Sequence, residues 1–167
     1  MLVREETGAA GASLGELKDW LRISGTGEDG LLEALLKSAT ALCEQFVGQW
    51  LVIGAARERV RADGTWQRLS ARPVVAISGV EGVAAEGYAV DIDAAGDGWV
   101  RVRPGDDPVE VRYQAGMAEA AEGLPEPIRQ GIVRLAAEQF AARSGESASP
   151  PAVVGALWRP FRRMRLA

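Results

Sequence analysis

Three aspartates in the middle of the chain have a spacing that could bind a calcium ion. Asp91, Asp93 and Asp97 follow the order in which a calcium-binding loop begins. Ala95 and Val102, however, stand where such a loop carries an oxygen ligand and a bidentate glutamate. The flanking residues alternate between polar and apolar, as strands do. We therefore interpret this stretch as a tight hairpin turn, with a small calcium-dependent enzyme as an alternative.

A glycine pattern near the N-terminus could bind phosphate. The stretch Gly25-Thr-Gly-Glu-Asp-Gly30 matches the glycine spacing of dinucleotide-binding turns. Such a turn follows a strand, so that its backbone N–H groups can bind the pyrophosphate. Here a helix pattern precedes the glycines, and Glu28 and Asp29 would repel phosphate. We interpret this stretch as a connection between two helices.

The chain contains no histidine, the commonest general base and the commonest ligand of transition metals. Ser13, Ser24 and Ser144 therefore have no histidine to activate them. No pair of carboxylates stands out as acid and base. Cys43 falls on the apolar face of a predicted helix, so we expect a core residue rather than a nucleophile. The sequence predicts a protein without catalytic activity, cofactor or metal.

The C-terminal segment, residues 144–167, combines a polar linker with large apolar side chains and arginines. Pro151 is expected to begin a short helix that Pro160 ends. Trp and Arg supply much of the binding energy at protein interfaces, which favours docking of this segment onto a partner. Alternatively, the helix folds back onto the chain's own core. The predicted docking residues are Val154, Leu157, Trp158, Phe161, Arg162, Arg163, Met164 and Arg165.

Charge is unevenly distributed along the chain. The net charge of the whole chain is −4, yet five arginines and one glutamate are the charged residues after Gln139. The acidic remainder argues against broad binding of nucleic acid. The arginine cluster could contact an acidic protein or the phosphates of DNA. A small DNA-binding or regulatory protein that uses this cluster is therefore a second alternative.

The length and composition suit one domain, residues 1–167, with 47% hydrophobic residues. No apolar run approaches the ~20 residues of a membrane span, and the first residues lack the order of a signal peptide. A single cysteine allows no internal disulfide. We expect a protein that is intracellular at synthesis and has no membrane contact.

Two long amphipathic helices are predicted to form the core. Apolar residues recur at helical spacing from Leu31 to Val47, with Gly48 placed as the C-terminal stop. A second such pattern runs from Ile128 to Phe140. Upstream of both, Ser13-Leu-Gly-Glu16 has the capping-box pattern that opens a short helix.

Residues 51–116 change to a period of two, which indicates half-buried strands. No helix pattern separates these strands, so antiparallel hairpins are favoured over a parallel sheet. The predicted fold class is α+β. It consists of a helical core of two long helices plus short terminal helices, with an inserted antiparallel β-hairpin module at residues 51–116. The predicted strands are 57–61, 88–93, 99–103 and 109–113.

In their order along the chain, the helical segments resemble the head–tail connector proteins, or adaptors, of long-tailed phages and gene transfer agents. The resemblance covers most of the chain outside residues 51–116. It lies in Leu17-Lys-Asp-Trp-Leu-Arg-Ile23, in the acidic turn Glu28-Asp29, in Leu31–Gly48, in Pro127-Ile-Arg-Gln-Gly-Ile-Val-Arg-Leu135, in Pro150-Pro-Ala-Val153 and in Leu157-Trp-Arg-Pro-Phe-Arg-Arg163.

The resemblance implies a structural role at the head–tail junction of a virion or phage-like particle, after synthesis in the bacterial cytoplasm. About twelve copies would form a closed ring below the portal and extend the channel for DNA, without sequence readout. The ring would also contact the next tail-side component, a stopper or tail terminator. The C-terminal segment would engage the portal protein through Val154, Leu157, Trp158 and Phe161, and through Arg162, Arg163 and Arg165.

Overall fold

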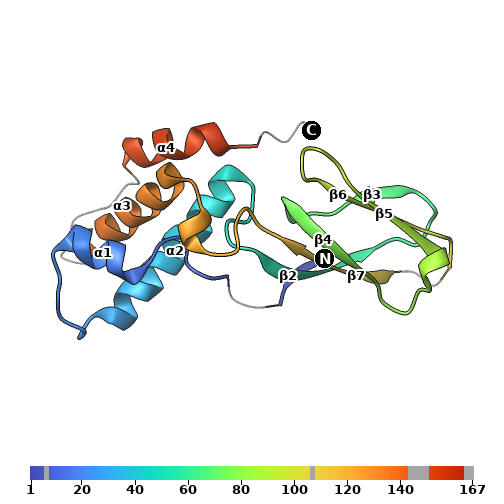
Figure 1. Cartoon of the computed structure of the whole chain (residues 1–167), viewed down its shortest axis with the longest axis horizontal. Coiled ribbons are helices and arrows are strands. Elements are labelled where there is room, and N and C mark those ends of the chain that lie inside the picture. Colours follow the sequence, from blue (N-terminus) through green and yellow to red (C-terminus); the bar gives the residue numbers. More distant parts are fainter. Residues whose placement is uncertain (6–7, 106–107, 143–150, 164–167) are drawn as a thin grey trace. The chain divides into compact units, whose positions relative to one another are not determined.

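The computed structural model describes residues 1–5, 8–105, 108–142 and 151–163. The chain divides into two compact units (Figure 1). The helical unit comprises Ala9–Val52 and Ala118–Ala167, and the β unit comprises Met1–Gly8 and Ile53–Met117. The predicted α+β class is therefore confirmed. No helix in the described part of the chain is both long and apolar enough to cross a membrane.

The helical unit places two long helices side by side and adds two short ones. The long helices α2 and α3 pack against each other, and α1 and α4 each contact α3. Short 3₁₀ turns precede α3 and follow α4. The helices are α1 (Leu14–Leu21), α2 (Asp29–Val47), α3 (Glu126–Ala142) and α4 (Ala152–Trp158), and the turns are η2 (Ala121–Gly123) and η3 (Arg159–Phe161).

The start of α1 has the predicted capping box. The backbone N–H of Glu16 donates to Ser13 Oγ at 3.2 Å, and that of Ser13 donates to Glu16 Oε2 at 2.8 Å. These two bonds satisfy donors that a helix start leaves without partners. The glycine stretch that begins at Gly25 connects α1 to α2, as the sequence predicted, and its last two residues, Asp29 and Gly30, open α2. An ion pair of 2.8 Å between Lys18 and Asp29 links the two helices.

The core of the helical unit forms where α2 faces α3. Leu32, Leu36 and Cys43 on α2 are buried, as are Ile128 and Ile132 on α3. Burial raises the pKa of the Cys43 thiol well above its ordinary value, so Cys43 is a core side chain, as predicted. Gly48 follows the last residue of α2. Its φ of 70° puts it in the left-handed conformation, which glycine adopts most readily.

The β unit consists of two antiparallel sheets. One has the strand order β1-β2-β7-β4, and the other has the order β3-β6-β5. A 3₁₀ turn, η1 (Ala85–Gly87), precedes β5. The strands are β1 (Leu2–Arg4), β2 (Gly54–Val60), β3 (Trp66–Arg68), β4 (Val74–Val80), β5 (Tyr88–Ile92), β6 (Gly98–Val102) and β7 (Val109–Ala115).

Three of these strands were not predicted from the sequence. Strand β1 comes from the N-terminus and pairs with β2, so the β unit is built from two separate stretches of the chain. Both β1 and β3 have three residues, too few to display a period of two. Strand β4 shifts its register twice against β7, which breaks the alternation of its side chains.

Candidate functional site

The C-terminal helix α4 is anchored by Trp158. Its indole is 4% exposed, and Nε1 donates to the carbonyl oxygen of Ile128 in α3 at 3.3 Å. A Cβ atom at Gly131 would lie 2.1 Å from Nε1, so the missing side chain of Gly131 makes the space for the indole. The ring of Phe46 in α2 lies 5.9 Å from the indole, between ring centroids. Trp158 is thus enclosed by the chain's own α2 and α3.

The residues after α4 are bound to the C-terminal end of α2. Gln49 Nε2 donates to the carbonyl oxygen of Phe161 at 2.8 Å, and the N–H of Arg163 donates to that of Val47 at 2.9 Å. The second bond satisfies a carbonyl that a helix end leaves without a helical partner. The guanidinium of Arg162 lies 5.5 Å from the centroid of the Phe46 ring, within cation–π range. The segment is held by hydrogen bonds as well as by apolar contact.

The structure divides the predicted docking residues into two groups. Val154 and Trp158 are buried in the helical unit, as the fold-back alternative expected. Arg162 is exposed. Leu157, Phe161 and Arg163 are half-buried, whereas Met164 and Arg165 lie outside the described residues.

An apolar groove of about 510 Å³ lies beside α4. Apolar side chains from α2, α3 and α4 line most of it, with Gln45 and Arg159 as the polar side chains. A groove of this kind can accept an apolar side chain, and it brings together no acid, base or nucleophile. Its apolar lining residues are Leu42, Phe46, Leu135, Pro151, Ala152, Val154 and Trp158.

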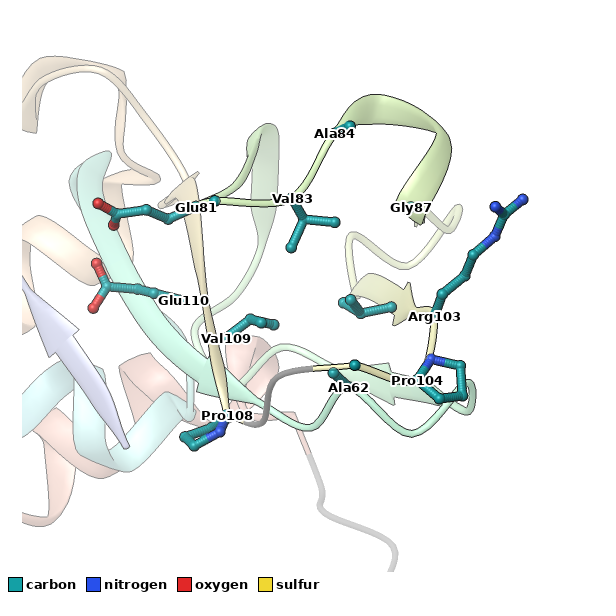
Figure 2. A pocket seen from close by; sticks show the side chains of 13 residues that line it. Ala62, Glu81, Val83, Ala84, Gly87, Arg103, Pro104, Pro108, Val109 and Glu110 are labelled. Atoms are coloured by element: carbon teal, nitrogen blue, oxygen red, sulfur yellow. The ribbon is translucent and has the colours of Figure 1, made fainter.

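The β unit contains a second hollow, of about 530 Å³. Figure 2 shows Val83, Val109 and Ala62 around it, while the charged ends of Glu81, Glu110 and Arg103 point away from it. No pair of titratable groups therefore converges on this hollow. Its geometry suits apolar contact rather than acid–base chemistry.

Inside the β unit, the buried carboxylate of Glu58 accepts several hydrogen bonds. It accepts from Tyr113 Oη at 2.7 Å and from the backbone N–H of Ser70 at 2.9 Å, and the hydroxyl of Ser70 also donates to it. The backbone N–H of Ala71 donates to Tyr113 Oη at 3.1 Å. Burial raises the pKa of Tyr113 well above its ordinary value. These bonds tie β2 and β7 to the residues before β4, which is a structural use of the carboxylate.

The three aspartates at 91, 93 and 97 form a hairpin turn rather than a calcium loop. The carboxylate of Asp93 accepts from the backbone N–H of Ala95 and of Asp97, and from Trp99 Nε1 at 3.1 Å. The turn joins β5 to β6, which confirms the hairpin interpretation. Asp97 forms an ion pair with Arg72, and Asp91 is exposed on β5. Among the described residues, no group of three acidic or cysteine side chains could hold a metal ion.

A set of aromatic and basic side chains on β3 and β6, exposed or half-buried, was not predicted from the sequence. Trp66 is 44% exposed, and the guanidinium of Arg101 lies 5.1 Å from the centroid of its ring. A signal was present, because the alternation in residues 99–103 placed Trp99 and Arg101 on one face of a strand. The short strand β3, which supplies Trp66, carried no such signal.

Comparisons with known proteins agree with the resemblance seen in the sequence. Residues 12–82 match the family described as phage gp6-like head-tail connector protein. No curated protein matches the chain significantly. The resemblance to head–tail connector proteins is thereby confirmed.

The whole chain also matches solved structures. It resembles a chain from the neck of an empty GTA particle computed with C6 symmetry, at 24% identity and a TM-score of 0.79. A chain from the neck of a native GTA particle computed with C12 symmetry also matches at 24% identity and a TM-score of 0.79. A chain from the virion of a native gene transfer agent (GTA) particle matches at 24% identity and a TM-score of 0.77. Each match covers 100% of this chain and 97% of the other.

Proposed function

Because residues 12–82 match the head–tail connector family and the whole chain has the fold of GTA neck chains, we propose that it is a connector subunit. It would join the head of a phage or phage-like particle to its tail and act as a structural part. The match to the family, together with a fold likeness that covers the entire chain, is the observation that carries this proposal.

We propose further that about twelve copies form a closed ring below the portal, through which DNA passes without sequence readout. The C6 and C12 symmetries of the two neck structures support a ring of this kind. The ring would contact the portal protein on one side and a stopper or tail terminator on the other. Its place would be the head–tail junction, after synthesis in the bacterial cytoplasm.

The portal contact would involve the outward side of the C-terminal segment. Val154 and Trp158 are buried, so their role would be to fix α4 on α3 rather than to enter a partner's groove. Exposed Arg162 and half-buried Leu157, Phe161 and Arg163 are then the side chains within reach of the portal. Met164 and Arg165, beyond the described residues, remain part of the proposed contact. Arginines on this side would pair with acidic residues of the portal.

Co-sedimentation with DNA-filled, tail-less heads from the same system tests both parts of the proposal. The unaltered chain is expected to sediment with the heads. Arg162→Glu is expected to weaken this binding about tenfold or more, because it would place like charges opposite each other at the contact with acidic portal residues, which costs several kcal/mol. Removal of the whole segment would be a poorer test, because it would uncover the pocket that Trp158 fills.

Lys37→Glu serves as the matched control, since Lys37 is exposed on α2 and the substitution changes the charge by the same amount. It should leave head binding unchanged. Equal effects of both variants would contradict the portal contact and leave the connector role standing. If the chain bound free DNA in a salt-sensitive way but did not bind heads, the regulatory alternative would replace the connector role.

A further inference from the structure

The sheet β3-β6-β5 has one face on which tryptophan and arginine alternate. In the register of β3 and β6, Trp66 lies opposite Arg101, and Arg68 lies opposite Trp99. Residues directly opposite each other in an antiparallel pair point to the same side of the sheet. These four residues therefore share one face, which we call the Trp–Arg face.

The Trp–Arg face is organised by contacts within the β unit. Arg101 lies over the ring of Trp66 at 5.1 Å, and Trp99 Nε1 donates to Asp93 Oδ2 at 3.1 Å. Arg68 approaches Asp97 Oδ2 at 3.8 Å, and its side chain is 48% exposed. The side chains are thus partly fixed before any partner arrives, which lowers the entropic cost of binding.

A surface hollow of about 440 Å³ adjoins this face. Arg101 and Arg103 both line it, together with Tyr88, Ala89 and the carboxylate-bearing Glu86. Two guanidinium groups beside one glutamate leave an excess of positive charge around the hollow. A carboxylate entering it could form charge-assisted hydrogen bonds with either arginine.

The chemistry of the face favours a protein partner over duplex DNA. A tryptophan with 44% of its surface exposed gains most from apolar cover, and the phosphates that line duplex DNA offer none. Tryptophan and arginine together are the residue types that most often dominate protein interfaces.

The chain itself carries a segment with the complementary chemistry. Glu119, Glu122 and Glu126 are all exposed in the helical unit, within eight residues that contain no basic side chain. Glu126 forms an ion pair with Arg129, so Glu119 and Glu122 carry the net negative charge of this segment. Small apolar residues, Ala120 and Ala121, lie between the first two glutamates. Such a segment could cover the indole of Trp66 with its alanines while its carboxylates reach arginines.

We propose that the Trp–Arg face of one copy binds the acidic segment Glu119–Glu126 of the neighbouring copy. This inference rests on the proposed ring, because a cyclic ring requires head-to-tail contacts between two different surfaces of the same chain. The hollow beside the Trp–Arg face, with Arg101 and Arg103 against Glu86, has the charge opposite to that of the acidic segment. The contact therefore forms between two unlike surfaces, and pairing of two like surfaces is disfavoured.

Cysteine cross-linking tests this contact on the full chain bound to tail-less heads. Ala89→Cys places a thiol on the Trp–Arg face, opposite Arg101, and Ala120→Cys places one in the acidic segment. Native Cys43 is fully buried and stays unreactive. With a short bismaleimide cross-linker, a mixture of the two single variants should give covalent dimers. The double variant should give a ladder of larger products, whereas each single variant alone should stay monomeric.

Reversal of charge provides a second measurement. Arg101→Glu and Glu122→Arg should each reduce the number of copies bound per head about tenfold, and the two together should restore it to within about threefold. Arg59→Glu, an exposed arginine on β2, is the control that should have no effect. Melting temperatures of the free chains would show that each variant is folded.

Each result then has one meaning. Dimers in the mixture together with rescue by the double reversal support the contact. Head binding without cross-linked dimers, or cross-links only within one copy, overturns the contact and leaves the connector role intact. Failure of the unaltered chain to bind heads overturns the connector role, and this contact with it. Loss of salt-sensitive binding to duplex DNA in Arg101→Glu, without any dimers, would assign the face to DNA instead.

Discussion

Two tryptophans, Trp158 on α4 and Trp66 on β3, have arginines near them and yet lie in opposite environments. Trp158 is 4% exposed, against Gly131 of α3 and the ring of Phe46. Trp66 is 44% exposed, and its ring is covered by the guanidinium of Arg101. The combination of tryptophan with arginine therefore does not by itself identify a docking surface. A tryptophan is available to a partner only where the chain's own helices and strands do not enclose its indole.

The largest effect is expected where the chain encloses the indole. Trp158→Ala should lower the free energy of unfolding by about 3–5 kcal/mol, because truncating a buried tryptophan leaves a cavity and removes its contacts. The donor to the Ile128 carbonyl is lost as well. Urea denaturation followed by circular dichroism would measure this change.

Val153→Ala is the control for this measurement, because Val153 lies on the same helix and is 44% exposed. Its effect should stay within about 0.5 kcal/mol. If Trp158→Ala were as mild as Val153→Ala, the indole would not belong to the core, and the portal would be its better partner. The two tryptophans would then not differ in whether the chain's own core encloses them.

The helical unit was largely predictable because its signals are local. The capping residues Ser13 and Glu16, the apolar period of α2 and the stop at Gly48 each act within one or two turns of helix. The burial of Trp158 could not be predicted from periodicity. That burial depends on Gly131, which lies 27 positions away in the sequence and whose lack of a side chain has no local signature.

The β unit was less predictable because its strands depend on distant partners. Strands β2, β5, β6 and β7 overlap the predicted stretches, and the side chains of β2, β6 and β7 alternate between two environments. Strand β1 is defined only by its pairing with β2, more than fifty positions later. The Trp–Arg face arises from the register of β3 against β6, and a register between distant strands cannot be read from a single stretch of residues.

A change at the wall of the Trp158 pocket should have the next largest effect. Gly131→Ala would place a Cβ atom 2.1 Å from Trp158 Nε1, which forces the indole or α4 to move. We expect a loss of about 1–3 kcal/mol, as for other overpacked cores. This outweighs the gain of about 0.5–1 kcal/mol that alanine gives over glycine inside a helix. Chemical denaturation would show a net decrease in stability.

The same substitution at Gly155 tests whether the loss of stability comes from crowding of the indole. Gly155 lies in α4, where a Cβ atom would have no neighbour within 4 Å. Gly155→Ala should therefore raise stability by about 0.5–1 kcal/mol through helix propensity alone. If both alanines raised stability, the pocket around Trp158 would be looser than these distances indicate.

The smallest effect on stability is expected at Trp66, the exposed member of the pair. Trp66→Ala removes a cation–π contact with Arg101, which is worth about 0.5–1 kcal/mol at an exposed site. It leaves no cavity, because the ring fills no enclosed space. Urea denaturation should therefore show a loss of at most about 1 kcal/mol, while the number of copies bound per head falls, because the indole would lose its place against the neighbouring copy. Trp66→Phe keeps an aromatic face for Arg101 and should recover part of that binding. A loss of stability as large as that of Trp158→Ala would mean that Trp66 stabilises the β unit itself. Trp66 would then serve folding, as Trp158 does, rather than assembly.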